Sequence, residues 1–192
     1  MAEKKEDRRV RKTKRQLRQA LTELLKEKPI QEIKVREIAD LIDINRGTFY
    51  QHYRDIYDML YQIEDELFAQ FNQILAETEE EADETNAMPL LTKIFTFLKD
   101  NSDLTVALMG PNGDPVFVEK VKALVKERCI HDWMHAYQDA KTPNFEYYYA
   151  FVVSGCLGLF QRWMENGSGE PPEAVAELAV EMILKGVNVL SA

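Results

Sequence analysis

The sequence is poor in glycine, proline and cysteine, and each scarcity excludes a class of protein. Its 192 residues include 8 Gly and 7 Pro, too few for a collagen-like or low-complexity chain. The only cysteines, Cys129 and Cys156, are too few for a disulfide-stabilised scaffold, and we expect both to be reduced. No apolar run is long enough to span a membrane, which takes about 18 residues. The N-terminus is charged where a secretory signal is apolar, so we expect a cytoplasmic protein.

Charge is divided unevenly along the chain. The net charge is −9, yet residues 1–54 contain 15 Lys and Arg against 9 Asp and Glu, a net charge of +6. Residues 55–192 contain 9 Lys and Arg against 24 Asp and Glu, a net charge of −15. A basic segment on an acidic body suggests that only the N-terminal end docks on DNA. The basic residues crowded into positions 1–18 fit an arm that contacts phosphates, although a solvated charge run has the same composition.

Residues 34–53 have the pattern of two short helices joined by a tight turn. Asn45 is suited to cap the second helix, over residues 46–53, because its side-chain oxygen accepts from backbone N–H groups. Phe49 and Tyr53 lie four positions apart, so we expect both to point inward. The other face carries side chains that are able to contact base edges in a major groove. The residues predicted to bind DNA are Lys14, Lys34, Asn45, Arg46, Gly47, Thr48, Tyr50, Gln51, His52 and Tyr53.

The stretch VREIADLIDINRGTFYQHYRD, followed by Asp58-Met59-Leu60, resembles the DNA-binding domain of the TetR family of transcriptional regulators. The run RGTFYQHY is its most specific part. The sequence departs from the family pattern at Asp43 (usually Gly), at Lys34 (usually a Ser or Thr cap) and at Ile56 (usually a Lys that touches phosphate). Asp tolerates a left-handed backbone better than most residues, so we expect the turn to survive.

This resemblance implies a sequence-specific regulator that binds a palindromic operator as a homodimer and responds to a small-molecule or protein effector. Repression is the expected outcome of operator binding. The stretch GCLGLFQRWMENG, residues 155–167, also looks like a subgroup of the family, the regulators of dihydroxyacetone kinase operons.

Helical periodicity continues through the rest of the chain, and no segment indicates a strand. Helices are expected over about 10–27 and about 55–80, and breaks rich in Gly, Pro and Asn separate the later ones. We therefore predict an all-α protein of about nine helices. A three-helix helix-turn-helix domain would occupy residues 1–54, and a helical ligand-binding and dimerisation bundle residues 55–192.

The helix expected over residues 145–165 is apolar around most of its circumference, which indicates burial on both sides. Either it is central in the monomer, or it forms a four-helix interface with the last helix and their copies in a second chain, as the resemblance implies. The predicted interface residues are Val152, Gly155, Leu159, Trp163, Leu178 and Met182. The resemblance also implies a ligand cavity, with candidate lining residues Phe95, Met109, Val121, Tyr137 and Phe151.

His131 and His135 are four positions apart on one helical face, a spacing that suits zinc. Asp132 stands where metal-dependent hydrolases have Glu, and no third ligand is evident. We therefore expect no metal, no cofactor and no enzymatic activity, since phosphate-binding glycine loops and nucleophile elbows are also missing. The alternatives to a DNA-binding regulator are a helical interaction protein with a vestigial helix-turn-helix and a metal-binding protein at the two histidines.

Overall fold

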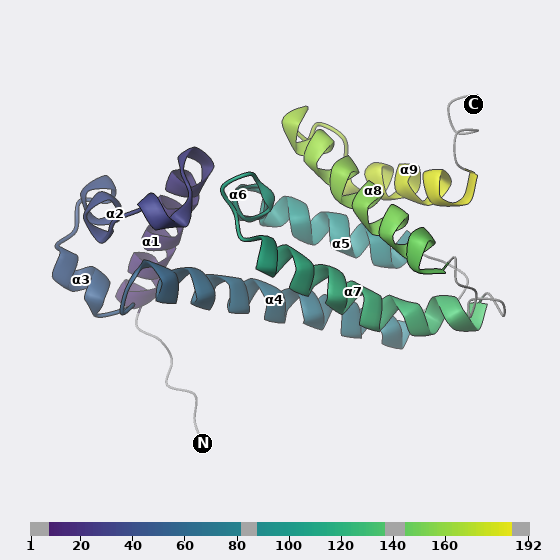
Figure 1. Ribbon diagram of the computed structural model, residues 1–192, viewed down its shortest axis with the longest axis horizontal. Helices are drawn as coiled ribbons and strands as arrows, with labels where there is room; N and C mark the ends of the chain where they lie inside the picture. Colours follow the sequence, from purple (N-terminus) through teal and green to yellow (C-terminus); the bar gives the residue numbers. More distant parts are fainter. Residues whose placement is uncertain (1–7, 82–87, 137–144, 186–192) are drawn as a thin grey trace, which may run out of the picture. The chain divides into compact units, whose positions relative to one another are not determined.

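Within the described residues 8–81, 88–136 and 145–185, the computed structural model contains helices and turns but no strand (Figure 1). Side chains are described in these ranges except at 78–81, 128–136 and 145. The prediction of an all-α protein with about nine helices is confirmed there. The helices are α1 (Arg8–Glu27), α2 (Val35–Leu41), α3 (Arg46–Tyr50), α4 (Ile56–Glu81), α5 (Met88–Asp100), α6 (Ser102–Met109), α7 (Pro115–Ala136), α8 (Phe145–Glu165) and α9 (Pro172–Lys185).

The chain divides into two compact units. The first combines residues 1–67 with 106–115, and the second combines 68–105 with 116–192. The first unit contains the whole segment 1–54, and a hydrogen bond ties the later stretch to it. The side-chain Nδ2 of Asn112 donates to the carbonyl oxygen of Lys26, at the end of α1, over 3.4 Å.

The core of the first unit lies along the apolar face of α1. Leu17, Leu21 and Leu25 are buried on that face at the helical spacing that the sequence predicts. Helix α1 packs on α2, and α2 packs on α3. The other elements contribute buried side chains to this unit, among them Ile38, Phe49, Tyr53, Met59 and Ile63. The short helices α2 and α3 are therefore held by a shared apolar core, because helices of this length are not stable alone.

Local hydrogen bonds set the limits of the two short helices. The Oδ1 atom of Asn45 accepts from the backbone N–H of Gly47 over 2.8 Å, so α3 begins at Arg46 as predicted. Asp43 has a φ of 54°, the left-handed conformation that the turn was expected to need. The turn is thus made with Asp in place of Gly.

Helix α2 begins without a side-chain acceptor at Lys34, since an ammonium group only donates. Half of a capping box is nevertheless present, because the Glu37 carboxylate accepts from the backbone N–H of Lys34 over 2.9 Å. The same carboxylate accepts from the ammonium group of Lys28. These contacts, that with Lys28 first, hold the pKa of Glu37 below its ordinary value. Lys28 and Glu37 thereby join the end of α1 to the start of α2.

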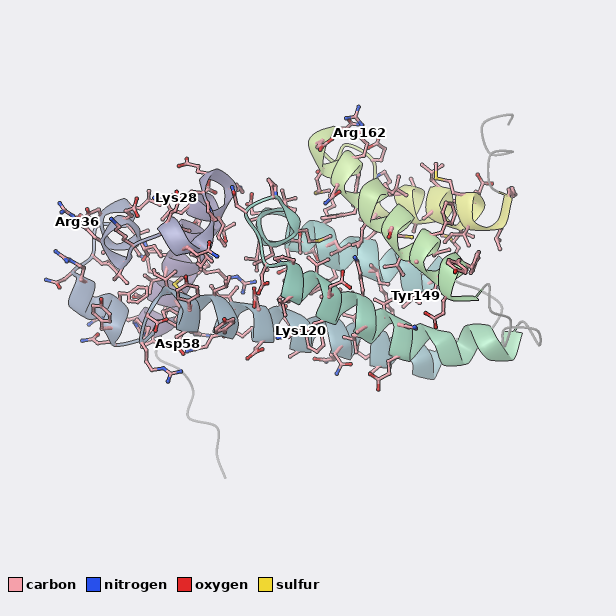
Figure 2. The ribbon with its side chains drawn as sticks, viewed as in Figure 1. Lys28, Arg36, Asp58, Lys120, Tyr149 and Arg162 are labelled. Carbon is pink, nitrogen blue, oxygen red and sulfur yellow. The ribbon has the colours of Figure 1, made fainter. Side chains whose placement is uncertain are left out.

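In the second unit, α5 packs along α9, and α8 also contacts α9. The ring of Trp163 on α8 lies edge-on to Phe95 on α5, with ring centroids 6.1 Å apart. The ammonium group of Lys99 sits 5.2 Å from the Trp163 centroid. Tyr149, labelled in Figure 2, lies at the other end of α8, and its hydroxyl donates to the backbone oxygen of Lys122 on α7 over 2.5 Å. One face of α8 is therefore fixed against α5 and α7.

None of the helices in the described part of the chain combines the length and the apolar character needed to cross a membrane.

Candidate nucleic-acid interface

Helix α3 presents a solvent-facing surface because two aromatic residues anchor its other side. Phe49 is 0% exposed and Tyr53 is 6% exposed, with ring centroids 5.7 Å apart. The remaining positions of the predicted contact face are Arg46, Gly47, Tyr50 and Gln51, which are exposed, and Thr48 and His52, which are half-buried. The inward positions are those that the sequence predicted, and the outward residues lie together on one short element.

The regular helix ends at Tyr50, earlier than the predicted residue 53, but the chain keeps turning. The backbone N–H groups of His52 and Tyr53 both donate to the carbonyl oxygen of Phe49, over 2.9 and 3.0 Å. Sharing one acceptor tightens the last turn, as is common at helix ends. Gln51 and His52 therefore remain part of the same turned surface.

The predicted DNA contacts do not all have the same surroundings. Tyr53 is buried, so its predicted contact with DNA is corrected: its ring belongs to the core of the first unit. Lys34 and Asn45 are exposed, and Lys14 is half-buried on α1. Ile56, which replaces the phosphate-touching Lys of the family pattern, is only 6% exposed. Its side chain packs inward and supplies no contact to DNA.

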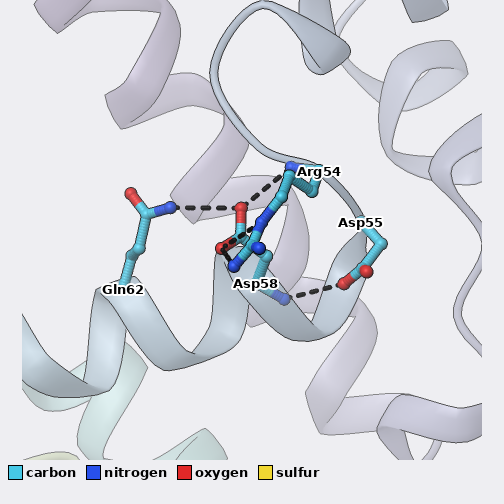
Figure 3. A network of polar contacts seen from close by, with 4 residues as sticks. All are labelled: Arg54, Asp55, Asp58 and Gln62. Carbon is cyan, nitrogen blue, oxygen red and sulfur yellow. Dashed lines mark hydrogen bonds and ion pairs between the residues drawn. The ribbon is translucent and has the colours of Figure 1, made fainter.

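Arg54 is an exposed cation that the sequence analysis missed (Figure 3). Its guanidinium group donates to Oδ1 of Asp58, from Nη2 over 3.0 Å and from Nε over 3.4 Å. The Oδ2 atom of Asp58 accepts from the backbone N–H of Arg54 over 2.8 Å and from Nε2 of Gln62 over 3.2 Å. Asp55 caps α4, since its Oδ1 accepts from the backbone N–H of Asp58 over 2.8 Å. The i, i+4 spacing of Arg54 and Asp58 was the available signal.

The contacts between Arg54 and Asp58 shift the pKa values of both side chains. The backbone N–H of Arg54, and then its guanidinium, hold the pKa of Asp58 below its ordinary value. The hydrogen bond to Asp58 raises the pKa of Arg54. Both groups are therefore ionised at neutral pH, and the pair is a fixed feature of the connection between α3 and α4.

The predicted ligand-cavity residues are distributed over both units. Phe95 is buried and Val121 half-buried in the second unit, whereas Met109 belongs to the first unit. Phe151 is 71% exposed, so its assignment to a cavity is corrected, and Tyr137 lies outside the described residues.

The two faces of α8 have different surroundings. The inward face carries Tyr149, Val152, Cys156, Phe160 and Trp163, at spacings of three and four residues. Burial raises the pKa of the Cys156 thiol to about 11, so this thiol is protonated at neutral pH. The opposite face carries exposed residues at the same spacing, namely Tyr147, Phe151, Gly155 and Gly158.

Four of the six predicted interface residues are at least partly exposed in the single chain. Gly155, Leu178 and Met182 are exposed, and Leu159 is half-buried. Val152 and Trp163 are instead buried against their own chain, so we correct their assignment to the interface. Trp163 is only 4% exposed because it packs on Phe95. The apolar pattern of α8 did not distinguish its two faces, since both are apolar.

The two histidines that were considered as metal ligands lie on α7, in a part where side chains are not described. His131 and His135 both belong to that helix. Among the side chains that are described, no group of three or more His, Cys, Asp or Glu could hold a metal ion. The histidine pair therefore stays untested.

Within the described residues, α2 and α3 are two short helices joined by a tight turn over an apolar core, which is the arrangement of a helix-turn-helix. Residues 17–63 match the family model described as bacterial regulatory proteins, tetR family. Residues 85–185 match a model described as transcriptional regulator C-terminal region. The chain belongs to the TetR family of transcriptional regulators, which bind DNA. This assignment favours transcription regulation over a vestigial motif or a metal-binding protein.

Solved structures share the fold across nearly the whole chain. The fatty acid degradation regulator FadR from Bacillus halodurans matches with a TM-score of 0.71, 15% identity, and coverage of 96% of this chain and 98% of that one. FadR from Bacillus subtilis, in complex with stearoyl-CoA, matches with a TM-score of 0.67 and 16% identity, and the match covers 90% of this chain and 98% of that one. The dihydroxyacetone kinase operon activator DhaS matches with a TM-score of 0.54 and 16% identity, and the match covers 92% of this chain and 97% of that one. A search of curated proteins found no match. At these identities the structures show a common fold.

Proposed function

We propose that the protein is a homodimeric repressor that binds a palindromic operator through α3 and releases it when an effector binds to the second unit. The observation that carries the DNA-binding part is the exposed face of α3, held outward by the buried Phe49. Arg46 and Gly47 lie at the N-terminus of the helix, where the backbone approaches DNA closely. The basic character of residues 1–54 supports docking by this end of the chain.

Gln51 is proposed to contact a base directly, because it is exposed and follows α3 without interruption. Gln51→Ala is expected to cost about 1–3 kcal/mol at the preferred base and to relax the preference there. Binding to a panel of operators with single base changes measures both effects. Gln70→Ala, at an exposed position in the second unit, is the matched control and should leave the preference unchanged. If Thr48, Tyr50, Gln51 and His52 were all changed to alanine and operator preference remained, α3 would not be the recognition helix.

The outward face of α8 supports the proposed dimer. Tyr147 is 78% exposed, and an added Cβ at Gly155 or Gly158 would meet no atom within 4 Å. Helix α9 also presents Leu178, Met182 and Leu184 to solvent. Apolar side chains beside small residues allow two helices to approach closely. A dimer formed through these faces would contain two recognition helices, one for each half of a palindrome.

The interior of the second unit contains a polar group that an effector could use. The Nε1 atom of Trp163 is buried and has no hydrogen-bond partner among the described residues. Such a group is costly to leave unsatisfied, so it favours a ligand that brings an acceptor oxygen. Phe95, which the sequence predicted as a cavity residue, packs against this ring. We propose an apolar effector with a carbonyl or similar oxygen that accepts from Trp163.

Trp163→Phe removes this donor and keeps the aromatic contact. It is expected to weaken effector binding by about 0.5–1.5 kcal/mol, the usual net value of one hydrogen bond. Stearoyl-CoA, the ligand in the Bacillus subtilis FadR structure, is a suitable first probe because it joins a long apolar chain to a thioester carbonyl. In a Trp133→Phe background, Trp163 is the single tryptophan, and its emission reports binding. An effector that released the operator equally well from the Trp163→Phe protein would exclude this contact.

A further inference from the structure

We propose that Arg54 contacts an operator phosphate and that Asp58 is the residue that positions its guanidinium group for this contact. The inference rests on the proposed docking of α3 on DNA. It adds a residue just after the recognition helix to the DNA-binding surface, and it assigns a role to the contacts in Figure 3.

The exposure of the pair is unequal, which leaves the cation available. The Arg54 side chain is 87% exposed and the Asp58 side chain only 14% exposed. A guanidinium group has five N–H donors in a fixed plane. Asp58 uses one on Nε and one on Nη2, so the two on Nη1 and the second on Nη2 are not used by it. These donors suit a phosphate, whose oxygens accept planar pairs of hydrogen bonds.

Asp58 restrains Arg54 at both ends. Its Oδ2 holds the Arg54 backbone N–H, and its Oδ1 holds the guanidinium group. Asp58 is itself fixed by Gln62 and by the cap at Asp55. An arginine that is already oriented loses less conformational entropy on binding than a free one. The orientation therefore favours phosphate binding, although the Asp58 carboxylate by itself would repel the phosphate.

The location supports a backbone contact. Arg54 directly follows the buried Tyr53, which anchors the turn after α3, so it lies beside the surface proposed to enter the groove. Ile56, two residues later, is buried and supplies no cation. Phosphates border the groove that a recognition helix enters, and contacts to them fix the position of the protein without reading sequence. Arg54 thus provides a positive charge near the position where the family pattern has Lys.

The first test is the dependence of operator affinity on salt. Arg54→Ala should weaken binding to specific and unrelated DNA by the same factor, about five- to tenfold at low salt, and reduce the slope of log K against log [salt] by about 0.9. Arg54→Lys should keep the slope and recover only part of the affinity. Lys120→Ala is the matched control, because Lys120 is also an exposed cation but lies on α7 in the second unit. It should change neither quantity.

The second test separates positioning from simple repulsion. Asp58→Asn should lower affinity a few-fold when Arg54 is present and should not lower it in the Arg54→Ala background. If the substitution raised affinity equally in both backgrounds, Asp58 would act only by repelling phosphate, and its positioning role would be excluded. An unchanged salt slope in Arg54→Ala, with wild-type operator binding intact, would overturn the phosphate contact. Failure of the wild-type protein to bind any DNA would instead refute the proposed function.

Discussion

Replacement of Gly158 by tryptophan is expected to give a folded monomer that has lost tight operator binding. Gly158 lies on the outward face of α8, and a Cβ added there meets no atom within 4 Å in the single chain. The larger side chain is therefore tolerated by the monomer, because it replaces the least helix-favouring residue after proline and extends into open space. In the proposed interface, the same side chain would keep two α8 helices apart.

The expected effect on DNA binding is large because a dimer binds both half-sites at once. Loss of the second contact should weaken operator binding by on the order of 10²–10⁴. Sedimentation at micromolar concentration measures the oligomeric state, and a binding titration measures the affinity. Gly169→Trp is the control, since Gly169 also has open space around its Cβ position but lies between α8 and α9. A monomeric wild type, or a Gly158→Trp protein that remained dimeric, would refute the proposed interface.

Phe49→Ala is expected to unfold the first unit. Phe49 is fully buried and contacts the ring of Tyr53, so truncation removes the main apolar anchor of α3. Truncation of a core aromatic costs about 3–5 kcal/mol, which is a large part of the net stability of about 5–15 kcal/mol that is usual for a domain. A thermal melt followed by circular dichroism should show the loss, and operator binding should disappear with it.

Gln51→Ala is the companion variant, because it changes an exposed residue just after the same helix. It should melt with the wild-type protein and yet show altered base preference, since surface substitutions usually change stability by no more than about 0.5 kcal/mol. Phe49→Ala therefore tests the folding of the first unit, whereas Gln51→Ala tests base recognition. A Phe49→Ala protein that kept its melting temperature would show that α3 does not depend on this anchor.

The helix-turn-helix was predictable because its determinants are local. The Asn45 side chain accepts from a group two residues away, and the left-handed turn depends on the tolerance of a single residue, Asp43. The inward positions Phe49 and Tyr53 follow from helical periodicity alone. Tyr53 was also among the predicted DNA contacts, but its burial assigns it to the core, as its helical spacing indicates.

The sequence by itself determined the helical class, the position of α3 and the limits of α8, since propensity, capping and periodicity act over a few residues. Only the tertiary structure decided which apolar face of α8 is inward, placing Trp163 in the core and Phe151 in solvent. Helical spacing is the same on both faces, and only packing against α5 and α7 distinguishes them. The union of residues 106–115 with the first unit likewise depends on contacts such as Asn112 with Lys26, which are 86 positions apart. Such contacts form between distant parts of the chain, so no local pattern encodes them.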